Sequence, residues 1–151
     1  MLFLECSPDA TLARTLGVPR QEIIHSSGKG KVARNLQKRP GVSGMVDQDP
    51  GSAEPEALRQ FCEESNHHGV ILKVDRERYN RLVILCPRLE EWIIQTARAA
   101  QIPMTDFRLS ENPGQLHADF NQRLPNFERL LKVLLEQRSA RLLHLQSLLT
   151  I

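Results

Sequence analysis

Two short acidic motifs stand where hydrophobic segments of this chain end. The first is Leu2-Phe3-Leu4-Glu5, and the second is Met45-Val46-Asp47-Gln48-Asp49. Side chains two residues apart in an extended segment point the same way, so Asp47 and Asp49 are expected to face one small volume. If both segments are parallel strands of one sheet, their carboxyl ends share the edge where open α/β sheets bind ligands. Three carboxylates there repel one another unless a cation lies between them, which suggests a magnesium site and phosphate chemistry.

The segments around these motifs alternate between strand and helix patterns. Apolar runs predict strands over 1–6, 22–25 and 42–46, and the segments after them predict helices over 7–16, from the turn at 26–31 onward, and over 55–64. The second of these helices carries Val32, Ala33 and Leu36. Such alternation favours a parallel sheet covered by helices.

The pattern changes in the second half of the chain. Apolar runs over 70–74 and 82–86 either pair as a hairpin or lie apart in the sheet, and a helix follows over 89–100 until Pro103. Residues 105–114 look like a loop, and the chain from 115 onward is leucine-rich and helical, with a break near Pro125. We therefore expect an α/β domain over 1–102 and a helical C-terminal extension over 103–151 that packs on it or on a partner.

Composition places the chain among ordinary globular proteins. It has 151 residues, 40% hydrophobic and 25% charged, which fits one domain with a helical appendage. The net charge of +2 is too small for a dedicated polyanion binder, although 20 Lys and Arg could still gather unevenly. The three widely spaced cysteines predict reduced thiols, buried as small hydrophobic side chains. No apolar run reaches the roughly 20 residues of a membrane helix, so we expect a soluble, cytoplasmic protein without membrane contact.

The order of these motifs resembles a known fold family. Leu-Phe-Leu-Glu, helix, short strand, Gly-Lys-Gly, helix and Val-Asp-Gln-Asp are similar to the Toprim fold of topoisomerases, primases and overcoming-lysogenisation-defect nucleases. The segment Cys86-Pro87-Arg88-Leu89-Glu90-Glu91-Trp92-Ile93 resembles the strand, proline and helix start of the nuclease-type branch. The resemblance covers residues 1–100 and implies a Toprim-like Rossmannoid α/β domain with a mainly parallel sheet flanked by helices. It also implies roles for Glu5 as general acid or base or metal ligand, for Asp47 and Asp49 as metal ligands, and for Glu90 as a further acidic group.

The chain departs from that family at identifiable positions. Cys6 follows the first Glu where family members usually have Gly, which hinders close backbone approach to a phosphate. The only tyrosine, Tyr79, falls in a charged turn, so topoisomerase-type strand passage is not expected. We expect a minimal single-domain version, without the ATPase domain that accompanies many such nucleases.

A glycine- and lysine-rich segment, Ser27-Gly28-Lys29-Gly30-Lys31, precedes the second helix. Backbone amides of Gly28 and Gly30, the positive helix end, and Lys29 and Lys31 could together cradle a phosphate or guide a nucleic-acid backbone toward the carboxylates. The segment lacks the G-x-x-x-x-G-K-[ST] spacing of a nucleotide-hydrolysing loop. An ordinary glycine turn with solvated lysines is the competing interpretation.

Four other features have structural interpretations as well as functional ones. His67 and His68 lack a metal-ligand spacing partner and are predicted to be an exposed loop pair, while His25 either assists a substrate or fills a polar edge. Glu90 and Glu91 either join the site or only offset a helix dipole. The leucine-rich tail either covers the sheet or forms a homo-oligomer or protein-partner surface.

These patterns lead to one functional hypothesis and two alternatives. We expect Mg²⁺- or Mn²⁺-dependent hydrolase chemistry on a nucleic-acid phosphodiester, as in a small Toprim-like nuclease. The first alternative is a non-catalytic binding or regulatory subunit that keeps the fold, which Cys6 favours. The second is a small-nucleotide phosphohydrolase that uses the same metal-binding residues.

Overall fold

A six-stranded sheet forms the centre of the molecule. The computed structural model describes residues 1–150, and its strands are β1 (Leu2–Leu4), β2 (Ile23–His25), β3 (Ser43–Asp47), β4 (Cys62–His67), β5 (Val70–Asp75) and β6 (Asn80–Leu85). Their order across the sheet is β2-β1-β3-β6-β5-β4. The pairings from β2 to β6 are parallel, and those of β5 with β6 and β4 are antiparallel. The sheet is therefore mostly parallel, as the alternating pattern predicts.

Helices lie on both faces of this sheet. They are α1 (Ser7–Thr15), α2 (Lys29–Lys38), α3 (Leu89–Ala99), α4 (Pro113–Gln122), α5 (Leu124–Glu136) and α6 (Ala140–Leu149), with 3₁₀ turns at Arg20–Glu22, Glu56–Leu58 and Met104–Phe107. Prolines in the first turns start α1, α4 and α5, and side-chain oxygens of Asn112 and Ser139 cap α4 and α6. This α/β architecture is compatible with a Rossmann-like fold.

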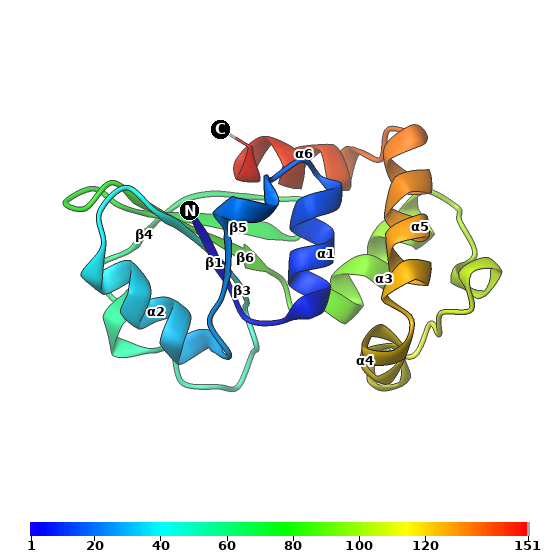
Figure 1. The fold of residues 1–151 in the computed structure, drawn as a ribbon, viewed down its shortest axis with the longest axis horizontal. Helices are drawn as coiled ribbons and strands as arrows, with labels where there is room; N and C mark the ends of the chain where they lie inside the picture. Colours follow the sequence, from blue (N-terminus) through cyan, green and yellow to red (C-terminus); the bar gives the residue numbers. More distant parts are fainter. Residues whose placement is uncertain (151) are drawn as a thin grey trace.

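Alternation along the strands divides the core into two clusters. Leu2, Leu4 and Met45 pack with α1, α3 and the C-terminal helices, whereas Phe3 and Val46 face α2. Figure 1 shows α2 on one side of the sheet and α1, α3 and α5 on the other. Because side chains alternate between the two faces, the short apolar strands contribute to both clusters.

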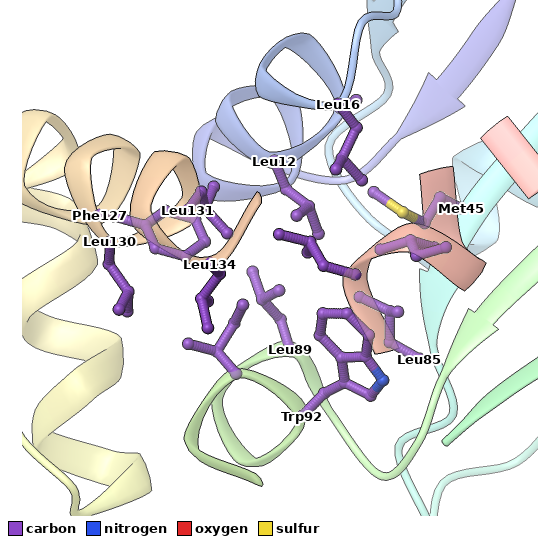
Figure 2. Packing of buried hydrophobic residues seen from close by; sticks show 14 of the residues in the cluster. Leu12, Leu16, Met45, Leu85, Leu89, Trp92, Phe127, Leu130, Leu131 and Leu134 are labelled. Carbon is purple, nitrogen blue, oxygen red and sulfur yellow. The ribbon is translucent and has the colours of Figure 1, made fainter. Parts of the chain in front are cut away.

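The C-terminal helices contribute to the larger of the two clusters. The buried side chains from this region are Phe120, Phe127, Leu130, Leu131, Leu134, Leu142 and Leu145. In Figure 2 the α5 residues pack toward Leu12 of α1 and toward Leu89 and Trp92 of α3. The leucines at these positions thus cover this chain's own sheet and helices.

Two expectations about local structure need correction. The helix predicted over 55–64 is wrong, because residues 56–58 form a 3₁₀ turn and Cys62–His67 is edge strand β4. The periodicity of 55–64 is weak, and pairing with β5 decides its conformation. The segment 105–114 is not all loop, since it contains a 3₁₀ turn and the start of α4.

The expectation that the cysteines are buried is wrong, whereas the expectation that their thiols are free agrees with the structure. Cys6 and Cys62 are exposed and Cys86 is half-buried, although all three are free thiols.

Strand 70–75 and strand 80–85 do pair, as the hairpin alternative predicts. Within residues 1–150, no helix has the length and apolar character that crossing a membrane requires.

Candidate functional site

The carboxyl ends of β1 and β3 lie next to each other at one edge of the sheet. The two strands are parallel neighbours, with Leu4 paired to Met45. Glu5 follows the last residue of β1 directly, and Asp47 is the last residue of β3. Parallel pairing thus brings these two carboxylates to the same edge, which is where open α/β sheets bind ligands.

Two helices begin at this edge and add two further carboxylates. Asp9 lies in the first turn of α1, and Glu90 lies in the first turn of α3. The backbone N–H of Leu89, at the start of α3, donates a hydrogen bond of 3.1 Å to Asp47 Oδ1. Acidic groups at helix N-termini are favoured by the helix dipole, so part of this arrangement is structural. We call Glu5, Asp9, Asp47 and Glu90 the carboxylate cluster.

Three carboxyl groups of the cluster have raised pKa values, chiefly because they are buried. Desolvation by burial, with the charges of Asp9, Glu5 and Glu90, raises the pKa of Asp47 to about 8. Desolvation and the charge of Asp9 likewise raise the pKa of Glu5 to about 7, against the opposing charge of Lys29. Burial also raises the pKa of Asp9 to about 6. A cation placed among these groups would relieve their repulsion and lower all three pKa values.

Asp49 does not share the surroundings of Asp47. Its Oδ1 accepts a 2.9 Å hydrogen bond from Arg88 Nε, and its Oδ2 accepts one of 2.9 Å from Ser52 Oγ. These two partners lower the pKa of Asp49. The expectation that Asp47 and Asp49 face one volume assumed an extended backbone, but β3 ends at Asp47 and Asp49 has φ of +54°.

The donor chemistry of the cluster fits a hard cation, although the side chains do not form a closed ligand set. Carboxylate oxygens are the ligands that Mg²⁺ prefers, and Mg²⁺ keeps several waters. In the part of the chain that the structure describes, no three His, Cys, Asp or Glu side chains converge at metal-ligand distances. Glu5 and Asp47, with Asp9 beside them, are the residues that would hold the ion.

The remaining acidic and thiol groups at the edge already have partners. Glu90 Oε1 lies 2.7 Å from His117 Nδ1, and Cys6 Sγ donates a 3.1 Å hydrogen bond to Asp9 Oδ2. Desolvation of the sulfur and the charge of Asp9 raise the pKa of the Cys6 thiol. A thiolate nucleophile at Cys6 is therefore disfavoured at neutral pH.

The glycine- and lysine-rich segment lies beside the end of β3. Lys29 Nζ donates a 3.1 Å hydrogen bond to the carbonyl of Gln48, and Lys29 begins α2. Gly28 precedes it with φ of +118°, a conformation that side chains rarely adopt. Gly30 and Lys31 are exposed in the first turn of α2, and Lys31 points into a groove along that helix.

Asp9 is the site residue that the motif argument did not identify. It is only 4% exposed, and its charge contributes to the raised pKa of both Glu5 and Asp47. The available signal was its position in the first turn of a helix that follows a strand-end glutamate. That signal is also the ordinary pattern of a helix N-terminus, which is why sequence alone passes over it.

The predicted histidine pair is exposed, as expected, but the loop prediction is wrong for His67, which is the last residue of β4, and only His68 lies in a turn. The pair also has a neighbour in α6. The ring of His144 in α6 lies 5.4 Å from that of His68 and 6.0 Å from that of His67, measured between centroids. His25 ends β2 and is exposed. None of these three positions touches the carboxylate cluster among the hydrogen bonds of residues 1–150.

Comparison with known proteins finds no matching family model, no matching curated protein and no matching solved structure.

Proposed function

We propose that this protein is a metal-dependent hydrolase of nucleic-acid phosphodiesters, with a Toprim-like arrangement of acidic residues. The observation that carries the proposal is the meeting of Glu5 and Asp47 at adjacent parallel strand ends. Their raised pKa values support it, because groups that are hard to ionise alone become stable carboxylates beside a divalent cation. In this proposal Glu5, Asp47 and Asp9 hold Mg²⁺ or Mn²⁺.

The site residues have separate roles in this proposed reaction. A bound divalent ion would offset phosphate charge and lower the pKa of a water nucleophile. Glu5 has a pKa of about 7 when no ion is bound, so in that state it can give or take a proton near neutral pH, whereas beside the ion it would act as a carboxylate ligand. Lys29, fixed to the Gln48 carbonyl next to the cluster, supplies positive charge for a phosphate oxygen. Leu89 N–H orients the Asp47 carboxylate from the other side.

One observation favours a second candidate, a non-catalytic binding or regulatory protein with the same fold. Asp49, which the resemblance makes a metal ligand, is engaged by Arg88 and Ser52. One expected ligand is therefore held by other side chains, and Cys6 follows the first Glu. A protein with these two features could keep the fold without catalytic turnover. The two candidates differ in one measurable property, which is metal-dependent hydrolysis.

The test is hydrolysis of labelled DNA, RNA and mononucleotides with Mg²⁺, with Mn²⁺ and with EDTA. We expect polymer cleavage by the wild type with either metal, and a loss of at least about 100-fold in Asp47→Asn and Glu5→Gln, in the range of removing a general acid–base group. Asp106→Asn and Glu136→Gln, at exposed sites away from the edge, serve as controls. Equal activity in all four variants would refute the site, and turnover of nucleotides alone would select the phosphohydrolase alternative.

A further inference from the structure

Edge strand β2 lies between two cavities that basic side chains line. A cavity of about 410 Å³ lies between β2 and α2 and includes Lys31, Arg34 and Lys38. A second cavity of about 330 Å³ lies between β2 and α1 and includes Arg14 and Arg20. Figure 1 shows α1 and α2 on opposite sides of the sheet. The cavity beside α1 and the cavity beside α2 therefore lie on either side of the sheet edge.

A single residue connects the two cavities. His25, the last residue of β2, lines both of them. The basic side chains of the two cavities therefore lie along one surface that passes around the end of the sheet. We call it the basic band, made of Arg14, Arg20, His25, Lys31, Arg34 and Lys38.

The charge of the band is unlike that of the whole chain. The protein has 20 basic and 18 acidic residues, yet no Asp or Glu of residues 1–150 lines either cavity. Arg39 adds a further cation beside the band, with its guanidinium 5.9 Å from the centre of the Phe3 ring. The nearest acidic residue along the chain is Glu22, which is exposed in the 3₁₀ turn before β2.

The Arg and Lys side chains of the band have no ionic partner among residues 1–150. In the described chain, none of Arg14, Arg20, Lys31, Arg34 and Lys38 lies within 4.0 Å of a carboxylate oxygen, whereas Lys73, Arg78, Arg88 and Arg123 each form an ion pair. Helix α2 contributes most of the charge and has no acidic residue. Unpaired cations that repel one another are stabilised by a polyanion, because phosphates offset the repulsion and release bound counterions.

We propose that the basic band binds the phosphate backbone of a nucleic-acid strand and leads it around edge strand β2 to the carboxylate cluster. The end point of this path rests on the proposed function, whereas binding by the band does not. Lys31, Arg34 and Lys38 are spaced i, i+3 and i+7 on one helix face, so their charges extend over about 10 Å. Phosphates along one strand of a duplex are roughly 3.4 Å apart, so this row of cations is long enough to lie beside more than one phosphate of a strand.

The length and shape of the band distinguish a polymer from other anions. A mononucleotide carries its phosphates at one end, so it would offset the cations of one cavity and leave those of the other unpaired. A bilayer presents a broad surface, and it would touch one face rather than two cavities that wrap around an edge. Lys29 continues the path, because it opens α2 and lies close enough to Glu5 for its charge to lower the pKa of that residue.

The experiment measures binding without metal, so that it is separate from catalysis. Fluorescence anisotropy with labelled 20-nucleotide single-stranded DNA and RNA is recorded in EDTA over a salt series. We expect Arg34→Glu with Lys38→Glu to raise Kd at least tenfold, and Arg14→Glu with Arg20→Glu to do the same. The neutral pair Arg34→Gln with Lys38→Gln should lower the slope of log K against log salt by about 1.4, since each single-strand phosphate contact contributes about 0.7.

The control variant is Arg129→Glu with Lys132→Glu, which reverses two exposed cations on α5. It should bind within twofold of the wild type, and far-UV circular dichroism should show every variant folded. If the α2 variants bind as well as this control, the band is not the nucleic-acid surface. If they lose binding to phosphatidylserine vesicles but keep nucleic-acid binding, the band is a membrane surface and the proposal is wrong. Retained binding by Asp47→Asn in EDTA would keep the band even if the hydrolase proposal fails.

Discussion

Arg88 and Asp49 form an ion pair in which Nε lies 2.9 Å from Oδ1, and the next residue, Leu89, donates its backbone N–H to Asp47. The two aspartates of the Asp-x-Asp motif therefore bind two successive residues at the start of α3. The pKa values of the two aspartates differ, because burial raises that of Asp47 against the lowering effect of the Leu89 hydrogen bond, whereas Ser52 and Arg88 lower that of Asp49. The N-terminus of α3 thus fixes the conformation of the loop that follows β3.

The first prediction concerns which aspartate binds metal. Asp47→Asn should weaken Mn²⁺ binding at least tenfold, because it removes a carboxylate from the cluster. Asp49→Asn should change it less than threefold, since Asp49 is held by Arg88 and Ser52. Isothermal titration of Mn²⁺ at pH 8 would measure both. Equal losses in the two variants would mean that Arg88 releases Asp49 to the ion, contrary to the observed contact.

Sequence patterns predicted the sheet edge but not the arrangement of groups on it. Glu5 and Asp47 follow strands whose apolar runs are plain, so parallel pairing was enough to place them together. The position of Asp49 depends on a single left-handed residue after β3, and Arg88 comes from a distant segment. The role of Asp9 depends on how α1 packs against β3, which no local pattern encodes. Strand β4 escaped prediction because its residues are mostly exposed.

The second prediction is a pH dependence of stability. An unfolded aspartate titrates near 3.9, whereas the folded pKa of Asp47 is about 8, so between these values the folded state binds more protons. The contribution of Asp47 is complete below pH 4 and is lost as the pH rises through about 8. Asp47→Asn removes that loss and keeps an oxygen for Leu89 N–H. The variant should gain at least about 1 kcal/mol over the wild type between pH 5 and pH 8, given about 1.4 kcal/mol per pKa unit.

Urea unfolding at a series of pH values would measure this difference. Asp106→Asn, which changes an exposed carboxyl away from the cluster, should show the same offset from the wild type at every pH. Added Mg²⁺ should stabilise the wild type more at pH 8 than at pH 5, because the ion competes with protons for the carboxylates. A constant offset for Asp47→Asn would show that its carboxyl is ionised normally.

The third prediction concerns Asn80, a buried amide that joins α2 to the sheet. Its Nδ2 donates to the carbonyls of Leu36 and Arg39 at 2.6 and 2.8 Å, and its Oδ1 accepts from Val42 N–H at 2.9 Å. Asn80→Ala would leave these backbone groups without their partner and should cost about 2–4 kcal/mol in the free energy of unfolding. Asn66→Ala on exposed strand β4 should stay within about 1 kcal/mol. Similar losses at both sites would exclude a special role for Asn80.

The fourth prediction compares two glycines near α2. A Cβ added to Gly44 would lie 3.0 Å from Leu36 Cδ1 and 3.0 Å from Val32 Cγ1, both in buried side chains. Gly44→Ala should therefore destabilise the protein by about 1–3 kcal/mol through overpacking. A Cβ at Gly30 meets no atom of the described chain within 4 Å, so Gly30→Ala in α2 should stabilise it by up to about 1 kcal/mol. Thermal melting of both variants tests the pair, and a neutral Gly44→Ala would mean that α2 shifts without cost.

The fifth prediction concerns the C-terminal helices. Leu131 is fully buried against the other helices of its cluster, whereas its neighbour Lys132 is exposed and forms an ion pair with Glu128. Leu131→Ala should lower the free energy of unfolding by about 2–5 kcal/mol and Lys132→Ala by no more than about 0.5 kcal/mol.

Deletion of residues 124–151 removes Phe127, Leu130, Leu131 and Leu134 together. The loss in the free energy of unfolding should exceed the typical total of about 5–15 kcal/mol. Circular dichroism of a chain ending at Arg123 should show no cooperative unfolding, and a cooperative transition would mean that the sheet and α1 form a core without these helices.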